Sequence, residues 1–277
     1  MARPVAGETR AIVHPSQAFR KFSYQAWAPD PPVSRAVNRF WRTEWNLTEP
    51  FAQTIVPHPA VNLVVQADSS ITVTGVLRHN DERTLDGSGW ALGALFRPGG
   101  FRLVHDVPMR TLVDLRVPAQ DIFGDNATRL AQAIVAAPSV ERALAAFAAF
   151  ISARLPEQVT PAEELAALVE AAASEDPPVT RASELAERMA VSQRTLQRLF
   201  AEHVGVGPKW VLDRYRVHAV AAQTQAPPTS WAEVAPKLGY TDQAHLTTDF
   251  GAHFGLPPGA YIRAEEQASL DRSDGPA

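Results

Sequence analysis

Residues 185–200 have the sequence LAERMAVSQRTLQRLF, and residues 234–250 have the sequence VAPKLGYTDQAHLTTDF. Both place an alanine four residues before the predicted turn residue, which is Ala190 or Gly239. Apolar residues follow each turn at the spacing of a second helix. Two helices that cross closely need a small residue at the crossing, and a tight turn favours glycine. The pattern therefore predicts two helix-turn-helix units, about 49 residues apart.

Each unit also contains the apolar residues of a small core. One follows the turn and two lie on the second helix: Val191, Leu196 and Phe200 in the first unit, and Tyr240, Leu246 and Phe250 in the second. Ser192 and Thr241 are predicted to cap the second helices, because a hydroxyl can accept a hydrogen bond from the first turn. Residues 230–233, Ser-Trp-Ala-Glu, match a capping box that opens the second unit. A helix from Pro208 to about Thr224 is expected to join the units.

Composition restricts the class of protein. The 277 residues, 45% of them hydrophobic, suffice for two domains with separate cores. The absence of cysteine excludes disulfides, thiolate metal sites and cysteine nucleophiles. No signal-peptide run and no run of about 18 apolar residues occurs, so a cytoplasmic protein with no membrane partner is expected. The net charge is −4, but Thr180–Arg263 contains nine Lys or Arg and seven Asp or Glu.

The N-terminal part has the composition of a β-rich domain. Turn signals rich in Pro, Gly, Asp and Ser separate short runs of β-branched residues. The predicted strands are Gln53–Val56, Val61–Gln66, Ile71–Val76 and Thr111–Arg116. Many short strands at close spacing predict a barrel or a sandwich.

Alanine-rich helices follow, at Asn126–Ala137, Ser139–Leu155 and Pro161–Ala173. The second of them places Leu144, Phe147, Ala148, Ile151 and Leu155 on one face. This stripe fits either packing onto the neighbouring domain or a dimer interface, and spacing does not distinguish them. The predicted divisions are a sensing domain (1–124), a helical linker or dimerisation helices (125–156), a helical module (157–265) and a disordered tail (266–277).

The helical module resembles the DNA-binding domain of the AraC/XylS family of bacterial transcription regulators. Residues 192–200 resemble the first recognition helix of that family, and the likeness extends over the segments 205–209, 238–246 and 254–263. It covers roughly Pro161–Ala264. The resemblance implies seven helices, with two recognition helices in successive major grooves of double-stranded DNA, about 34 Å apart. RNA polymerase would be a partner of an activator, and activation and repression both stay open.

The outer face of the first recognition helix is suited to reading bases. Arg194 and Arg198 can bridge the guanine O6 and N7 atoms, and Gln197 can bridge adenine. The candidate DNA contacts are Gln193, Arg194, Thr195, Gln197, Arg198 and Lys209, and in the second unit Gln243, Ala244, Thr247 and Thr248.

The second unit has fewer cations. Ala244, Thr247 and Thr248 stand where the first unit has Arg194, Gln197 and Arg198, and Asp249 adds a negative charge. His245 fits a packing or phosphate role, and Pro236 removes one hydrogen bond from the preceding helix. We therefore expect the first unit to dominate base readout. Arg214 and Arg216, like Lys209, fit either phosphate contacts or solvated helix surface.

The N-terminal segments 93–100 and 117–124 resemble an AraC-type sensing domain. The likeness implies a cupin-like barrel and leaves the effector open. The complete chain is thus expected to be an α+β multidomain protein. Candidate effector contacts are Trp41, Trp45, His58, Trp90, Phe96 and Arg97. The aromatic side chains fit a pocket lining or a filled core, and Arg97 fits a carboxylate anchor or a surface salt bridge.

The leading hypothesis is an effector-responsive transcription regulator without catalytic residues or cofactor. His58, His79 and His105 raise the question of a metal, but they lack metal-ligand spacing, and no metal is expected. Two alternatives stay open, namely a cupin-type metalloenzyme and a pure interaction domain, each fused to the DNA-binding module. A homodimer also stays open.

Overall fold

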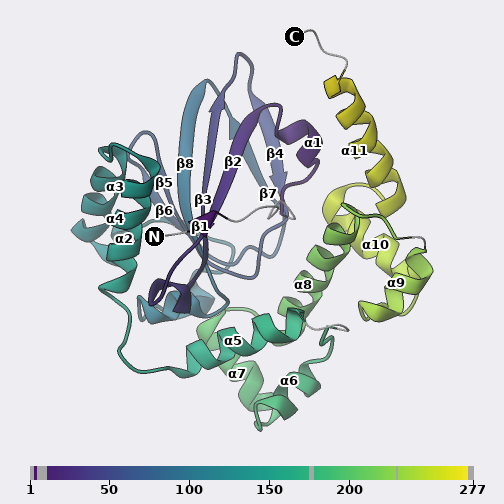
Figure 1. Cartoon of the computed structure of the whole chain (residues 1–277). Coiled ribbons are helices and arrows are strands. Elements are labelled where there is room, and N and C mark those ends of the chain that lie inside the picture. Colours follow the sequence, from purple (N-terminus) through teal and green to yellow (C-terminus); the bar gives the residue numbers. More distant parts are fainter. Residues whose placement is uncertain (1–2, 5–10, 175–177, 229, 274–277) are drawn as a thin grey trace.

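The computed structural model of the protein describes residues 3–4, 11–174, 178–228 and 230–273. A β-rich N-terminal domain is followed by a helical C-terminal part, so the chain has the α+β multidomain architecture that the sequence predicts (Figure 1). In these ranges, no helix has both the length and the apolar character needed to cross a membrane.

The N-terminal domain contains two antiparallel sheets. The larger sheet contains, in spatial order, β1 (Arg3–Pro4), β2 (Phe22–Ala28), β3 (Val37–Asn46), β8 (Ser88–Phe96), β5 (Asn62–Gln66), β6 (Ile71–Thr74) and β9 (Arg116–Pro118). The smaller sheet pairs β4 (Phe51–Ile55) with β7 (Asp81–Leu85). The two longest strands, β3 and β8, pair along most of their length and form the centre of the domain.

The predicted strand at Thr111–Arg116 is wrong. The chain instead forms a short 3₁₀ helix, η3 (Met109–Thr111), and reaches the sheet only at β9, which pairs with β6. The reason is the spacing of the buried residues: Met109 and Leu112 both point into the core and lie three residues apart. That spacing fits a helical turn, whereas a strand needs a spacing of two.

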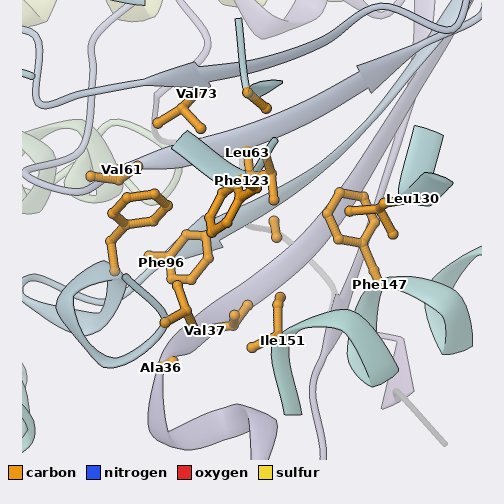
Figure 2. Packing of buried hydrophobic residues seen from close by; sticks show 14 of the residues in the cluster. Ala36, Val37, Val61, Leu63, Val73, Phe96, Phe123, Leu130, Phe147 and Ile151 are labelled. Carbon is orange, nitrogen blue, oxygen red and sulfur yellow. The ribbon is translucent and has the colours of Figure 1, made fainter. Parts of the chain in front are cut away.

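Three helices cover one face of the larger sheet (Figure 1): α2 (Gln120–Phe123), α3 (Asp125–Val135) and α4 (Val140–Ser152). Figure 2 shows Phe147 and Ile151 of α4 turned toward the sheet residues. The rings of Phe40 on β3 and Phe147 lie 5.8 Å apart. The apolar stripe of α4 thus packs against the chain's own sheet, with Leu144, Phe147 and Ile151 buried and the other two residues half-buried.

Seven helices follow within the described residues, the number that the family resemblance implies. They are α5 (Pro161–Ser174), α6 (Ala182–Arg188), α7 (Gln193–His203), α8 (Pro208–Gln223), α9 (Trp231–Lys237), α10 (Gln243–Phe254) and α11 (Pro258–Ser273). In Figure 1, α8 runs from the group α5–α7 to the group α9–α10. It is therefore the element that connects the two predicted units.

The prediction of a disordered tail from residue 266 is wrong for residues 266–273, because α11 continues to Ser273. Residues 274–277 lie outside the described residues. The helix is held by α1 (Pro15–Ala18) and the turn that follows it. Glu265 accepts a hydrogen bond from the Ser16 amide at 2.8 Å, and Arg20 donates to the carbonyl of Ala268. The N-terminal domain thus contacts the last helix of the chain.

Candidate functional site

The two helix-turn-helix units share the hydrogen bond that closes the turn. In the first, the Val191 amide donates to the Ala186 carbonyl at 3.0 Å. In the second, the Tyr240 amide donates to the Ala235 carbonyl at 2.9 Å. The residue before each donor is left-handed, with φ 53° at Ala190 and φ 77° at Gly239. The structure therefore confirms that the two stretches fold alike.

The caps of the second helices correct one prediction. The Ser192 hydroxyl accepts from the Thr195 amide at 3.1 Å, as expected. In the second unit the cap is Asp242, which accepts from the His245 amide at 2.8 Å, so the prediction of Thr241 is wrong. The second turn is one residue longer than the first, and this moves the cap from Thr241 to Asp242. Ser230 precedes α9 at the N-cap position, but its side chain makes no capping hydrogen bond, so the predicted capping box is wrong.

Each second helix is anchored by two fully buried side chains. These are Leu196 and Phe200 on α7, and Leu246 and Phe250 on α10. On α10, the ring of Phe250 also stacks on Phe254, with centroids 4.4 Å apart. Because these residues point inward, the opposite face of each helix is left for solvent or for a partner.

The exposed face of α7 displays several hydrogen-bond donors. Gln193, Arg194, Gln197 and Arg198 are all exposed. Arg198 is 69% exposed, and its guanidinium lies 3.7 Å from Glu202, one turn away. A surface pair of this kind contributes little to stability, so the guanidinium can leave it at small cost. Thr195 is half-buried, and its hydroxyl lies 3.0 Å from the Ser192 hydroxyl.

The exposed face of α10 displays fewer hydrogen-bond donors than that of α7. Gln243, Ala244 and Thr248 are exposed, and Thr247 is half-buried. The Thr248 hydroxyl donates back to the Ala244 carbonyl at 2.9 Å, which uses its one donor inside the helix. His245 is exposed at the helix start, with its ring edge-on to Tyr240 at 5.1 Å.

Asp249 is half-buried and belongs to a cluster around Tyr240. Its carboxylate accepts a hydrogen bond from the Tyr240 hydroxyl at 2.8 Å. Burial and the Asp249 charge both raise the pKa of Tyr240 well above its usual value. Arg216 lies over the Tyr240 ring at 4.4 Å and donates to the Gly239 carbonyl at 3.2 Å. Arg216 therefore stabilises the turn and is withdrawn from phosphate contact.

Arg214 is also withdrawn from the surface. It is 3% exposed, donates to the Arg78 carbonyl at 3.2 Å, and lies 4.9 Å over the Trp210 ring. Burial lowers the pKa of Arg214 to about 10, so it stays protonated at neutral pH. Lys209 differs, because its side chain is 84% exposed and pairs with Asp213 at 2.7 Å. Of these three cations on α8, Lys209 alone has an exposed side chain.

A cavity of about 260 Å³ lies between the two sheets of the N-terminal domain. One wall of the cavity is the face of the larger sheet that α3 and α4 do not cover. Alternate residues of β3 line it, among them Arg39, Trp41, Thr43 and Trp45. This spacing of two on one strand is the signal that identifies Arg39 as a lining residue, although the sequence prediction had omitted it.

Two glycines of β8 let the tryptophans lie flat on the sheet. Trp41 pairs with Gly93, and Trp45 pairs with Gly89. A Cβ at either glycine would overlap the indole ring opposite. The Trp41 indole also donates to Asn62 Oδ1 at 3.0 Å, which fixes its orientation. The cavity therefore has an aromatic wall that the backbone itself accommodates.

Three of the six candidate effector residues line this cavity, namely Trp41, Trp45 and His58. The other three lie elsewhere. Phe96 is fully buried in the core beneath α3 and α4, against Phe101 at 5.1 Å (Figure 2). Trp90 lies under Arg42 at the edge of that core. Arg97 pairs with Glu170 of α5 and donates to the Ser34 carbonyl at 2.7 Å, so it joins the domains and cannot anchor a ligand in the cavity.

His58 connects the cavity to the helical part. Its ring stacks on His218 of α8, with centroids 4.3 Å apart, and Arg39 Nη2 lies 3.4 Å from His58 Nε2. His218 is 2% exposed and lies 3.3 Å from the Pro57 carbonyl. His79 and His105 have other surroundings, and in the described ranges no group of three or more His, Cys, Asp or Glu could hold a metal ion.

Comparison with known proteins agrees with this geometry. Residues 185–264 match a family described as Helix-turn-helix domain, and residues 25–118 match a family described as Domain of unknown function (DUF6597). An AraC-like transcription regulator of Streptomyces lividans is 35% identical over 79 residues. The HTH-type transcriptional activator RhaS of Escherichia fergusonii is 34% identical over 86 residues. Residues 185–264 therefore form a helix-turn-helix domain, and it is of the AraC type.

These matches cover a minor part of each protein. The first spans 28% of this chain and 26% of the Streptomyces protein, and the second spans 31% of both chains. Among solved structures, ToxT of Vibrio cholerae covers 88% of this chain and 98% of its own, at 11% identity and a TM-score of 0.43. An AraC-type regulator of Chromobacterium violaceum covers 36% and 89%, at 22% identity and a TM-score of 0.32. At these scores the two structures add nothing to the assignment, which rests on the sequence matches and on the geometry.

Proposed function

We propose that the protein is a sequence-specific, DNA-binding transcription regulator whose activity responds to a small molecule. The observation that supports it best is the duplication of one helix-turn-helix geometry on the two ends of α8. Both second helices have a buried anchor and an exposed outer face, which is the arrangement that two recognition helices need in adjacent major grooves. The family match over residues 185–264 supports the same role.

The two helix-turn-helix units are proposed to contribute unequally to base recognition. Arg194, Gln197 and Arg198 can form bidentate contacts with base edges, whereas the second unit offers Gln243 and weak threonine contacts. Lys209 is proposed to contact phosphate at the start of α8, because it is exposed and paired only with Asp213 in the described part of the chain. The first unit would then determine which sequence is bound, and the second would mainly position the domain.

DNA binding can be tested by selecting duplexes of about 30 base pairs, three helical turns, from a random pool with the full-length protein. We expect a sequence preference, together with protection of two neighbouring major grooves on one face of the selected duplex. Binding to the selected and random duplexes with equal affinity would contradict the proposal.

The cavity between the sheets is the proposed effector site. Its volume of about 260 Å³ lies just below the range of roughly 300–1,000 Å³ that is usual for ligand pockets, so a small ligand is expected. A ligand that binds only the folded protein raises its melting temperature. A screen of small molecules should therefore find shifts that Trp41→Ala abolishes and that Trp90→Ala retains, each relative to its own unliganded variant. If both variants lost the shift in melting temperature equally, the ligand would bind outside this cavity.

A further inference from the structure

The N-terminal domain touches the first recognition helix directly. The 3₁₀ helix η3 packs on the C-terminal end of α7, where a Cβ at Gly205 would come within 2.8 Å of the Met109 carbonyl oxygen. The next residue, Arg110, is exposed. It lines one cleft with Arg198, Ala201 and Glu202 of α7, and another with the link Gly205–Gly207 that leads into α8. Arg110 therefore stands between the recognition helix and the start of α8.

The first cleft opens on the DNA-reading side of α7. Ala201 is exposed and lies three residues after Arg198, and Arg198 lies four residues after Arg194. Residues at these spacings share one face of a helix. Arg110 is thus beside the face that the proposed function directs at DNA.

The size of the major groove decides what Arg110 would meet there. The groove is about 12 Å wide, and a helix with its side chains is about 10–12 Å across. One helix fills the groove, so a segment packed on the flank of that helix must remain outside it. Outside the groove lies the sugar-phosphate backbone, which is negatively charged along its whole length.

The charges of the cleft support an anionic partner. Three arginines and two carboxylates line it. Arg102 pairs with Asp106 at 3.2 Å, and Arg198 approaches Glu202 at 3.7 Å. Arg110 has no ion pair or side-chain hydrogen bond in the described part of the chain. The cleft therefore keeps one positive charge that is not neutralised locally.

We propose that Arg110 of the N-terminal domain contacts a DNA phosphate beside the first recognition helix. This inference rests on the proposed DNA-binding function and adds to it a contact from outside the helix-turn-helix domain. A phosphate contact is indifferent to base sequence, so it would strengthen binding to selected and random duplexes alike. DNA would then be held by the sensing domain and the reading domain together.

The test compares the full-length wild type with Arg110→Gln on a selected duplex and on a random duplex, at salt concentrations from about 50 to 200 mM. Arg129→Gln is the matched control, because Arg129 is an exposed arginine on α3 that bonds only to Asn126 in the described residues. We expect Arg110→Gln to weaken both complexes several-fold and to lower the salt slope by about 0.9, the value for one phosphate. The control should change neither quantity.

Three results would overturn the inference. Unchanged affinity and slope in Arg110→Gln would make Arg110 an ordinary surface residue. Tighter binding would mean that the segment around η3 obstructs DNA. A loss confined to the selected duplex would make the contact a base contact. In all three cases the wild type still binds DNA, whereas a wild type that binds neither duplex would contradict the proposed function as well.

Discussion

The two helix-turn-helix units share a scaffold and differ in the surface they present. Both have the turn hydrogen bond, the left-handed residue and two buried side chains on the second helix. The first has exposed arginine and glutamine on its outer face, and the second has alanine and a threonine bonded to its own helix. Asp249 of the second unit and Arg216 of α8 hold Tyr240 in place instead. The comparison shows that the residues that preserve a fold and those that read a ligand can change independently.

The shared scaffold predicts equal losses when its anchors are removed. Phe200→Ala and Phe250→Ala each delete a fully buried ring. Each should lower the free energy of unfolding of its unit by about 3–5 kcal/mol. Denaturant titration followed by circular dichroism measures both. A loss below about 1 kcal/mol at either position would mean that the two cores are not equivalent.

The Tyr240–Asp249 hydrogen bond belongs to the second unit alone. Tyr240→Phe leaves a half-buried carboxylate without this donor, and should lower the free energy of unfolding by about 1.5–3 kcal/mol. At the equivalent position the first unit has Val191, which makes no such bond, so Val191→Ala should lose only packing.

The same residue predicts a dependence on pH. The pKa of Tyr240 is raised in the folded state, so its contribution is complete below the unfolded pKa of about 10 and is lost as the pH rises above it. Stability should therefore fall above about pH 10, and less steeply in Tyr240→Phe. Tyr261, whose pKa is raised by burial and by Glu265, accounts for part of the remaining fall. Identical pH profiles for wild type and variant would contradict this account.

The turn residues offer a reciprocal pair of substitutions. Gly239→Ala puts a Cβ on a left-handed residue and against the side chain of Thr180. It should cost at least about 1–2 kcal/mol. Ala190→Gly removes the same strain from the first unit and should stabilise it by at most about 1 kcal/mol. Melting temperatures that move in the same direction for both variants would show that the turns are not alike.

The smallest expected effects concern the caps. Ser192→Ala and Asp242→Ala each remove a side-chain acceptor at a helix start, and should each cost about 1 kcal/mol. Ser230→Ala is the control, because Ser230 makes no capping bond and its loss should change little. Thermal unfolding of the three variants checks the ranking. A cost at Ser230 as large as that at Asp242 would favour the capping box over the observed geometry.

The helical part could be predicted well because its signals are local. The turn, the small residue at the crossing and the apolar spacing all lie within about five turns of helix, roughly 18 residues at 3.6 residues per turn. The one-residue extension of the second turn was missed, since Val191 and Tyr240 align at one offset and Phe200 and Phe250 at the next. That single residue explains the error at Thr241.

The N-terminal domain could be predicted only in outline. The central strand β8 is buried on both faces from Ala91 to Phe96, so it lacks the alternation that identifies a strand. The sequence suggests Phe96 as a pocket residue because it is aromatic, and Arg97 because a guanidinium can anchor a carboxylate. Their real partners, Glu170 and the core under α4, come from distant parts of the chain. Trp41 and Trp45 do line a cavity, and only the structure shows that Gly93 and Gly89 accommodate them.

The central claim is that the first unit determines DNA affinity and specificity. It is tested most directly by measuring, at one salt concentration, the affinity of Arg198→Ala and Thr248→Ala for a duplex selected by the wild type. We expect Arg198→Ala to lose about 1–3 kcal/mol of binding free energy and to relax the base preference at its position. Thr248→Ala should stay within about 0.5 kcal/mol of the wild type, because its hydroxyl is bonded to Ala244. Similar losses from both variants would contradict the uneven readout.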